Sequence, residues 1–140
     1  MGGYGALKLG LKHHDKFCSL HSHSGPLALL HRSPGSKPGA LPADLRSVFG
    51  DDAFNGSEDP FKIVASIDHG LLPSMWIDCG SDDELLEQNR MFHKHLTDLR
   101  IPHESNEFPG GHTWHYWDLH VREALAFHAK NLQLKFDDRG

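Results

Sequence analysis

The sequence predicts an α/β fold with about three parallel strands and flanking helices. Residues 71–80 form a nearly continuous apolar run that closes at Gly80, which is typical of a parallel strand buried on both faces. The segments after it alternate as helix, strand and helix with short connections, and this alternation favours a parallel sheet. With 140 residues, 38% of them hydrophobic and 24% charged, the chain has the size and composition of one domain.

The first elements follow from apolar spacing and turn residues. Residues 2–14 predict a helix, because Tyr4, Leu7 and Leu11 stand three and four positions apart, as on one helix face. Glycines at positions 2, 3 and 5 are poor helix formers. They indicate either a close approach of the backbone to a strand or a bound acyl group, or a flexible glycine-rich terminus. Residues 17–23 then predict a short strand that ends in a turn.

Residues 26–60 are expected to form a lid-like insert. Their composition shifts to Pro, Gly, Ser, Asp and Asn, with a short helical stretch at 41–49. A connection of this length inside a compact domain is usually a binding segment or a lid, and a disordered insert is the alternative. Asp59 and Pro60 then introduce a short helix through Ser66.

The second half carries the strongest elements. After the strand at 71–80, acidic residues 82–84 begin a helix that runs to about Arg100, with Asp82 expected as its cap. Residues 103–108 predict a weaker strand, and residues 115–132 a terminal helix. The side chains expected to face inward are Leu85, Asn89, Phe92, Leu96 and Leu99 on the first helix and Leu119, Leu125 and Ala126 on the second.

Charge and hydropathy exclude two classes of partner. The formal net charge is −5, and Lys and Arg are scattered singly, so we expect no nucleic-acid partner. No apolar run approaches the ~20 residues that span a bilayer, so no membrane span is expected. The amino terminus lacks the pattern of a signal peptide, which favours a cytoplasmic location but leaves the compartment open.

The cysteines and histidines do not indicate a structural metal or a disulfide. Cys18 and Cys79 stand far apart, and both are interpreted as buried thiols. Three close histidine pairs stand out among thirteen histidines, at 21/23, 93/95 and 112/115, but none has the i, i+4 spacing that places two ligands on one helix face. The sequence therefore predicts no dedicated metal site and places most histidines on the surface.

Chemistry-bearing residues follow two strands that we expect to lie in one sheet. The acids Asp82 and Asp83 come after the strand at 71–80, and His112 comes after the strand at 103–108. Functional groups of parallel sheets collect at the carboxyl ends of the strands. An acid followed by a histidine supplies the last two members of a Ser–Asp–His triad, in which the carboxylate orients the imidazole and the imidazole takes the serine proton. Helix capping is the alternative role for Asp83.

Three segments together carry a family resemblance. They are Met-Gly-Gly-Tyr-Gly-Ala at 1–6, Trp-Ile-Asp-Cys-Gly-Ser-Asp-Asp at 76–83, and Phe-Pro-Gly-Gly-His-Thr-Trp-His-Tyr-Trp at 108–117. In this order they resemble the esterase family of α/β-hydrolases that includes esterase D (S-formylglutathione hydrolase), tributyrin-type esterases and mycolyltransferases. The resemblance implies that Asp83 is the family acid and His112 the family base. It also implies that Met1 follows the catalytic serine and lines the oxyanion hole with its backbone N–H.

The chain departs from the family at the nucleophile. It contains no G-x-S-x-G, and its serines do not stand on an elbow between a strand and a helix; the serines considered are Ser19, Ser22, Ser24, Ser36, Ser57 and Ser81. The resemblance therefore implies that residues 1–140 are a partial, carboxyl-terminal α/β-hydrolase domain that starts just after the nucleophile. The serine itself is expected immediately before Met1.

The resemblance implies a carboxylic ester or thioester hydrolase that acts on small acyl groups through an acyl-enzyme, without a metal or an organic cofactor. The 140-residue chain alone is expected to be inactive. One alternative is an acyltransferase of the same family, and another is a non-catalytic interaction or regulatory fragment. An exposed sheet edge near residues 17–20 is expected to promote self-association. The aromatic residues Trp114, Tyr116 and Trp117 either wall an acyl pocket or anchor the last helix.

Overall fold

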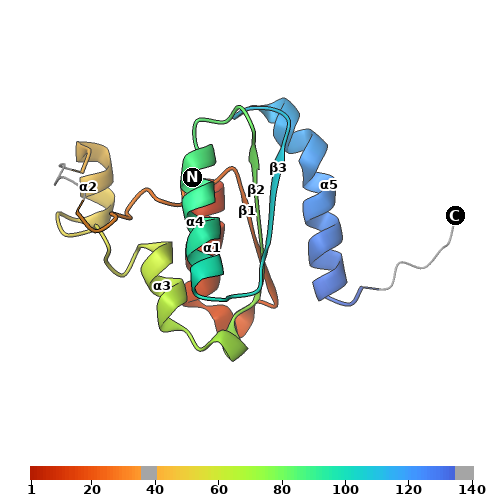
Figure 1. The fold of residues 1–140 in the computed structure, drawn as a ribbon, viewed down its shortest axis with the longest axis horizontal. Helices are drawn as coiled ribbons and strands as arrows, with labels where there is room; N and C mark the ends of the chain where they lie inside the picture. Colours follow the sequence, from red (N-terminus) through yellow and green to blue (C-terminus); the bar gives the residue numbers. More distant parts are fainter. Residues whose placement is uncertain (36–40, 135–140) are drawn as a thin grey trace, which may run out of the picture.

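A parallel sheet of three strands lies between two layers of helices in the computed structural model, which describes residues 1–35 and 41–134 (Figure 1). The strands are β1 (Ser19–His23), β2 (Ser74–Gly80) and β3 (Glu104–Phe108), in the order β1-β2-β3. Both pairings are parallel, and the register sets His23 beside Asp78 and Cys79 beside Glu107. The predicted α/β fold with three parallel strands is confirmed.

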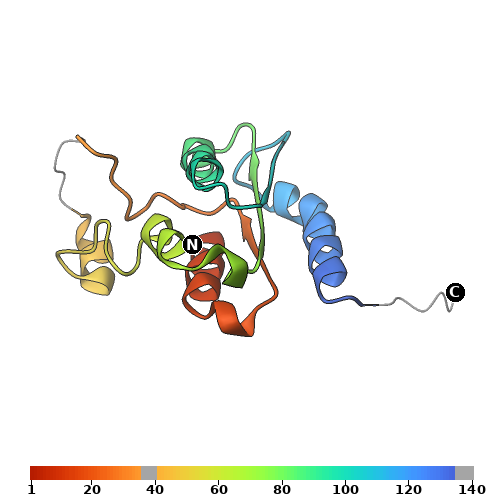
Figure 2. The same ribbon diagram turned by 60° about the horizontal axis from the view of Figure 1, so that its bottom comes forward.

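The helices cover the two faces of the sheet unequally. Helices α1 (Gly2–Lys12), α3 (Pro60–Ser66) and α4 (Leu86–Asp98) lie on one side, and α5 (Trp114–Asn131) lies on the other (Figures 1 and 2). The remaining elements are α2 (Ala43–Phe49) and two 3-10 turns at His14–Lys16 and His69–Leu71. None of the helices within the described residues is long and apolar enough to cross a bilayer.

Successive side chains of the strands point to opposite faces of the sheet and pack into two separate hydrophobic clusters. Leu20, Met75 and Ile77 are buried with side chains of α1, α3 and α4 in the largest hydrophobic cluster. Trp76 points to the opposite face, where it packs with Ala124 and Phe127 of α5. Each fully buried side chain of this size contributes about 1.5–3 kcal/mol relative to leaving it exposed. The larger cluster therefore fixes β1 and β2 against α1 and α4.

The start of α1 lies against the end of β1. A Cβ on Gly3 would lie 2.8 Å from Ser22 Oγ and 2.9 Å from the His23 carbonyl oxygen, so only glycine fits there. The expected close approach of backbone to a strand is thus confirmed at Gly3. It holds the first turn of α1 at the carboxyl ends of the strands.

Helix α4 begins later than predicted. It starts at Leu86 without a side-chain cap, so the expectation that Asp82 caps it is wrong. Instead, the Asp83 carboxylate accepts a hydrogen bond from the Leu85 amide and shapes the turn before the helix. Because the helix begins later, Leu86 is buried in place of the expected Leu85. Asn89, Phe92 and Leu96 are buried as expected.

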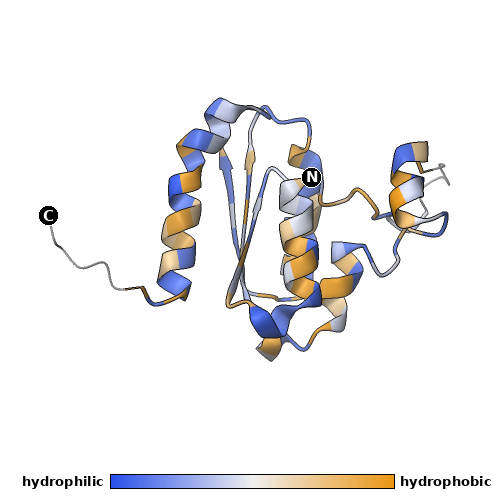
Figure 3. Cartoon of the chain, turned by 180° about the vertical axis from the view of Figure 1, so that it is seen from behind, coloured by the Kyte–Doolittle hydropathy of each residue, from blue (hydrophilic) through white to orange (hydrophobic). Residues whose placement is uncertain are grey.

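The predicted inward face of α5 is wrong. Leu119 and Leu125 are 50% and 64% exposed. Buried positions instead recur four, four and three residues apart, at Tyr116, His120, Ala124 and Phe127. His120 occupies an inward position because its ring stacks on Phe108 with centroids 4.3 Å apart. Hydrophobic and hydrophilic residues alternate along α5 (Figure 3), so hydropathy alone selects the wrong stripe.

The apolar run at 71–80 forms a strand only from Ser74. Leu71 belongs to the preceding 3-10 turn and is 62% exposed. Proline at position 73 has no N–H for the ladder, which agrees with a strand that begins one residue later. The two thiols also differ: Cys79 is buried on β2, and burial raises its pKa to about 12, whereas Cys18 is exposed rather than buried as predicted.

The described part of residues 26–60 packs beside α1. Leu30, Leu41 and Ala53 form a second cluster with Tyr4, whose hydroxyl donates to the Glu58 carbonyl oxygen at 2.7 Å. Figure 1 shows α2 on the far side of α1 from α5. The lid role of this segment stays a prediction.

Candidate active site

Two loops leave the carboxyl ends of β2 and β3 side by side. The Ser81 amide donates to the Phe108 carbonyl oxygen at 2.8 Å, and the Asp82 amide donates to that of Gly110 at 2.9 Å. A Cβ on Gly80 would lie 2.2 Å from the Gly110 carbonyl oxygen, so glycine is required at position 80 for this contact. Backbone hydrogen bonds therefore fix the loop that carries Asp83 against the loop that carries His112.

Asp83 and His112 meet across these loops. His112 Nδ1 lies 2.9 Å from Asp83 Oδ2, and Asp83 Oδ1 accepts from the Leu85 amide at 2.9 Å. Asp83 is 5% exposed, whereas the His112 side chain is 37% exposed. A carboxylate at Nδ1 assigns the proton to that nitrogen and leaves Nε2 with a lone pair. Asp83 thus contacts the histidine and holds the turn before α4, but it is not the N-cap of that helix, so the capping alternative is wrong.

The aromatic residues after His112 divide between two roles. Tyr116 is 1% exposed and anchors α5 to the sheet. Trp117 meets the His112 ring edge to face, with centroids 4.9 Å apart, and Trp114 meets Trp117 in the same manner at 5.2 Å. Trp114 is 83% exposed, and both tryptophans line a cavity beside His112. The core-anchoring interpretation therefore holds for Tyr116, and an acyl-pocket role for the two tryptophans stays a prediction.

This cavity of about 430 Å³ brings together residues from three parts of the chain. Its lining residues are Met1, Gly2, Gly3, Ala6, His21, His23, Ser24, His112, Trp114 and Trp117. Met1 is the first residue of the α1 turn, where its carbonyl oxygen accepts from the Gly5 amide. The start of a helix presents unpaired N–H groups and a partial positive charge. The structure therefore sets Met1 and His112, two of the three predicted site residues, on one cavity, with Asp83 behind His112.

Ser24 lies in the same wall at the end of β1. Its backbone is in the left-handed region, with φ 49°, and its amide donates to the Asp78 carbonyl oxygen at 2.9 Å. The Ser24 hydroxyl is buried, and a loop rather than a helix follows it. Ser24 therefore lacks the exposed elbow geometry of a hydrolase nucleophile.

A second group of polar residues surrounds Asp78, which sequence reasoning missed. Asp78 Oδ1 lies 2.5 Å from His21 Nε2 and 2.8 Å from His23 Nδ1, and Oδ2 accepts from the Tyr116 hydroxyl at 2.7 Å. Burial favours the neutral acid, but the three hydrogen bonds outweigh it and lower the pKa of Asp78 to about 2. Residues i and i+2 of a strand share a face, so the spacing of His21 and His23 was the available signal.

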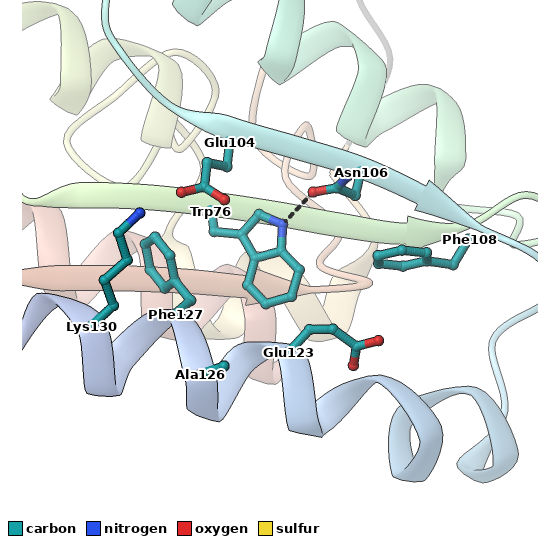
Figure 4. A pocket seen from close by; sticks show the side chains of 8 residues that line it. All are labelled: Trp76, Glu104, Asn106, Phe108, Glu123, Ala126, Phe127 and Lys130. Atoms are coloured by element: carbon teal, nitrogen blue, oxygen red, sulfur yellow. Dashed lines mark hydrogen bonds between the residues drawn. The ribbon is translucent and has the colours of Figure 1, made fainter. Parts of the chain in front are cut away.

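Another cavity, of about 410 Å³, opens between the sheet and α5 (Figure 4). Its centre is the Trp76 indole, whose N–H donates to Asn106 Oδ1 at 2.9 Å. Carboxylates of Glu104 and Glu123 lie at its border, and its lining contains no histidine. It therefore offers no acid–base pair comparable to Asp83 and His112.

Comparison with known proteins identifies the family of this chain. Residues 1–128 match the "Putative esterase" family. An acetyl esterase of Caldicellulosiruptor saccharolyticus is 31% identical over 93% of this chain, and the chain spans 52% of that relative. A ferulic acid esterase structure superposes with a TM-score of 0.71 at 27% identity, over 94% of this chain and 49% of the other. An S-formylglutathione hydrolase of Staphylococcus aureus shares the fold, with a TM-score of 0.70 at 23% identity over 91% of this chain and 51% of the other.

The chain thus spans about half the length of these relatives and shares the fold of the part that it matches. The match covers β1 to β3 and the loops that carry Asp83 and His112. The chain belongs to the "Putative esterase" family of α/β-hydrolases.

Proposed function

We propose that this chain supplies the acid, the base and one oxyanion-hole donor of a serine ester hydrolase. The observation that supports the proposal is the 2.9 Å contact between Asp83 Oδ2 and His112 Nδ1 at the carboxyl ends of β2 and β3. His112 borders the cavity at the start of α1, where the family places the residue after its serine. In this proposal the serine stands immediately before Met1 in a longer polypeptide.

The chemistry follows from the geometry. His112 Nε2 takes the proton of the serine hydroxyl as the oxygen attacks the ester carbonyl, and Asp83 stabilises the imidazolium that forms. The Met1 amide and the positive end of α1 stabilise the developing oxyanion. His112 then returns the proton to the leaving alcohol, and water hydrolyses the acyl-enzyme.

We propose small carboxylic esters or thioesters as substrates. An acetyl esterase and a ferulic acid esterase are among the relatives, and both names denote ester hydrolysis. Trp114 and Trp117 give the cavity an apolar wall beside His112, which suits an acyl group.

The test joins this chain to the amino-terminal half of the acetyl esterase relative, so that its catalytic serine precedes Met1. We call this protein the joined enzyme. It is expected to hydrolyse p-nitrophenyl acetate through an acyl-enzyme, and His112→Ala is expected to abolish turnover. His115→Ala is the matched control, because His115 is exposed and does not line the cavity.

Two results would contradict the proposal. In the first, the joined enzyme turns over ester and keeps its activity after His112→Ala. In the second, the joined enzyme folds, yet it neither hydrolyses ester nor reacts with a fluorophosphonate probe. The second result would favour a non-catalytic fragment, whereas transfer of the acyl group to an added alcohol in preference to water would favour an acyltransferase.

A further inference from the structure

We propose that His21, His23 and Asp78 form a binding site for a divalent transition metal ion, with Zn²⁺ as the ion that suits the site best. Two imidazoles and one carboxylate are a common set of protein ligands for zinc, which leaves a fourth position for water or another ligand. None of these ligands is Asp83 or His112, although His21 and His23 line the same cavity as His112, and the proposal does not depend on ester hydrolysis.

The three side chains converge because of the sheet register. His21 and His23 are two residues apart on β1 and point to the same face, and His23 pairs with Asp78 of β2. One ligand atom from each residue lies within 4.8 Å of the other two. The earlier expectation of no metal site used the i, i+4 spacing of helices, which does not apply to residues on a strand.

An ion fits with small movements. Zinc bonds of about 2.0–2.2 Å at tetrahedral angles separate two ligand atoms by about 3.3 Å. Asp78 Oδ1 now lies 2.5 Å from His21 Nε2 and 2.8 Å from His23 Nδ1. Each of these two contacts therefore has to widen by less than about 1 Å.

Neighbouring groups already hold the three ligands in place. The His21 ring stacks on Trp76 at 4.4 Å between centroids, and the His23 ring stacks on Tyr116 at 5.4 Å. The Tyr116 hydroxyl donates to the second oxygen of Asp78. Outer hydrogen bonds of this kind orient metal-binding carboxylates and raise affinity.

The donor set selects the ion. Asp78 is fully buried and supplies a carboxylate oxygen to the site. Imidazole nitrogen suits zinc and its neighbours, whereas calcium and magnesium prefer sites built entirely from oxygen. Both imidazoles line the cavity, which gives an ion a path of entry and access to a fourth ligand.

The first experiment titrates the whole 140-residue chain with Zn²⁺ in low-micromolar solution, in competition with a chromophoric chelator. We expect one ion per chain and a lower affinity in each of three variants. Tyr116→Phe is expected to weaken binding about 10- to 100-fold, and His21→Gln and Asp78→Asn to weaken it more. The matched control is His103→Gln, because His103 Nε2 and His93 Nδ1 form another histidine pair 2.8 Å apart on the surface.

The second experiment needs no variant. Diethyl pyrocarbonate modifies accessible histidines of the unaltered chain, and mass spectrometry locates each modification with and without Zn²⁺. Selective protection of His23, with His103 and His115 still modified, supports the site. The proposal is wrong if the chain binds no Zn²⁺ under these conditions, if His103→Gln removes the binding, or if protection falls on His93 and His103 instead.

Discussion

Gly80 and Gly110 are in direct backbone contact, and a Cβ on residue 80 would lie 2.2 Å from the Gly110 carbonyl oxygen. This contact stands at the base of the two loops that carry Asp83 and His112. Because an amide of one loop also donates to a carbonyl of the other, a displacement at Gly80 changes the separation of the acid and the base.

We therefore expect Gly80→Ala to lower both activity and stability. In the joined enzyme, the clash with backbone is expected to cost about 1–3 kcal/mol of unfolding free energy. Urea unfolding and kcat for p-nitrophenyl acetate measure the two effects. Gly5→Ala is the matched control, since nothing lies within 4 Å of its Cβ and alanine favours a helix by about 1 kcal/mol. Equal losses in the two variants would refute the role of the contact.

His112 and Asp83 are expected to contribute unequally. By the losses measured in serine proteases, His112→Ala is expected to lower kcat of the joined enzyme on the order of 10⁶-fold and Asp83→Ala on the order of 10⁴-fold. The base transfers the proton, whereas the acid orients and stabilises the base. Near-normal kcat/KM in His112→Ala, together with loss of activity in His115→Ala or His120→Ala, would show that another histidine is the base.

The isolated chain is expected to lack serine-hydrolase turnover, because Ser24, the serine among the described residues that line the cavity, has a buried hydroxyl. Purified chain is incubated with p-nitrophenyl acetate and a fluorophosphonate probe, and peptides are mapped by mass spectrometry. Neither burst nor labelling is expected. Covalent labelling at Ser24 that disappears in His112→Ala would instead identify Ser24 as a nucleophile within this chain.

Acid is expected to destabilise the fold through Asp78. Its pKa in the folded chain is about 2 against an ordinary 3.8, so its ionised form stabilises the folded state above about pH 4 and this contribution is lost as the pH falls toward 2. The contribution is on the order of 2 kcal/mol. Urea midpoints of the joined enzyme between about pH 5 and 2.5 should fall more than those of Asp78→Asn. Asp82→Asn, at an exposed position, should follow the parent protein; equal slopes in all three would contradict this assignment.

Self-association through the edge of β1 is the remaining expectation. Among the described strands β1 pairs only with β2, which leaves its other edge unpaired. Phe17 precedes this strand and is 49% exposed, so Phe17→Lys should reduce concentration-dependent association measured by light scattering. Leu132→Lys, at an exposed apolar position after α5, is the control. An equal effect of both variants would assign association to general surface hydrophobicity.

The sequence predicted the order of elements and the meeting of Asp83 with His112, because both depend on local signals. The apolar run before Gly80 and the glycine turn before His112 mark where two parallel strands end, and parallel strands end at one edge. The inward face of α5 could not be predicted in this way. It depends on His120, a polar side chain whose burial follows from a ring in another strand, Phe108.

The contacts of His21 and His23 with Asp78 could not be predicted from local sequence patterns either. His21 and His23 lie far from Asp78 in sequence, and only the register of β1 against β2 brings them together. The spacing of two residues is visible in the sequence. It shows that both side chains share a face only once residues 19–23 are known to form a strand, and the partner strand must also be known before Asp78 can be placed beside them.

The backbone hydrogen bonds between the loops at Gly80 and Gly110 hold acid and base together without help from any nucleophile-bearing segment. Asp83 and His112 are thus in contact before any serine-bearing segment docks. Under the proposed function, ester hydrolysis would report the docking of such a segment, and the chain could serve as one half of a split-enzyme sensor of protein association.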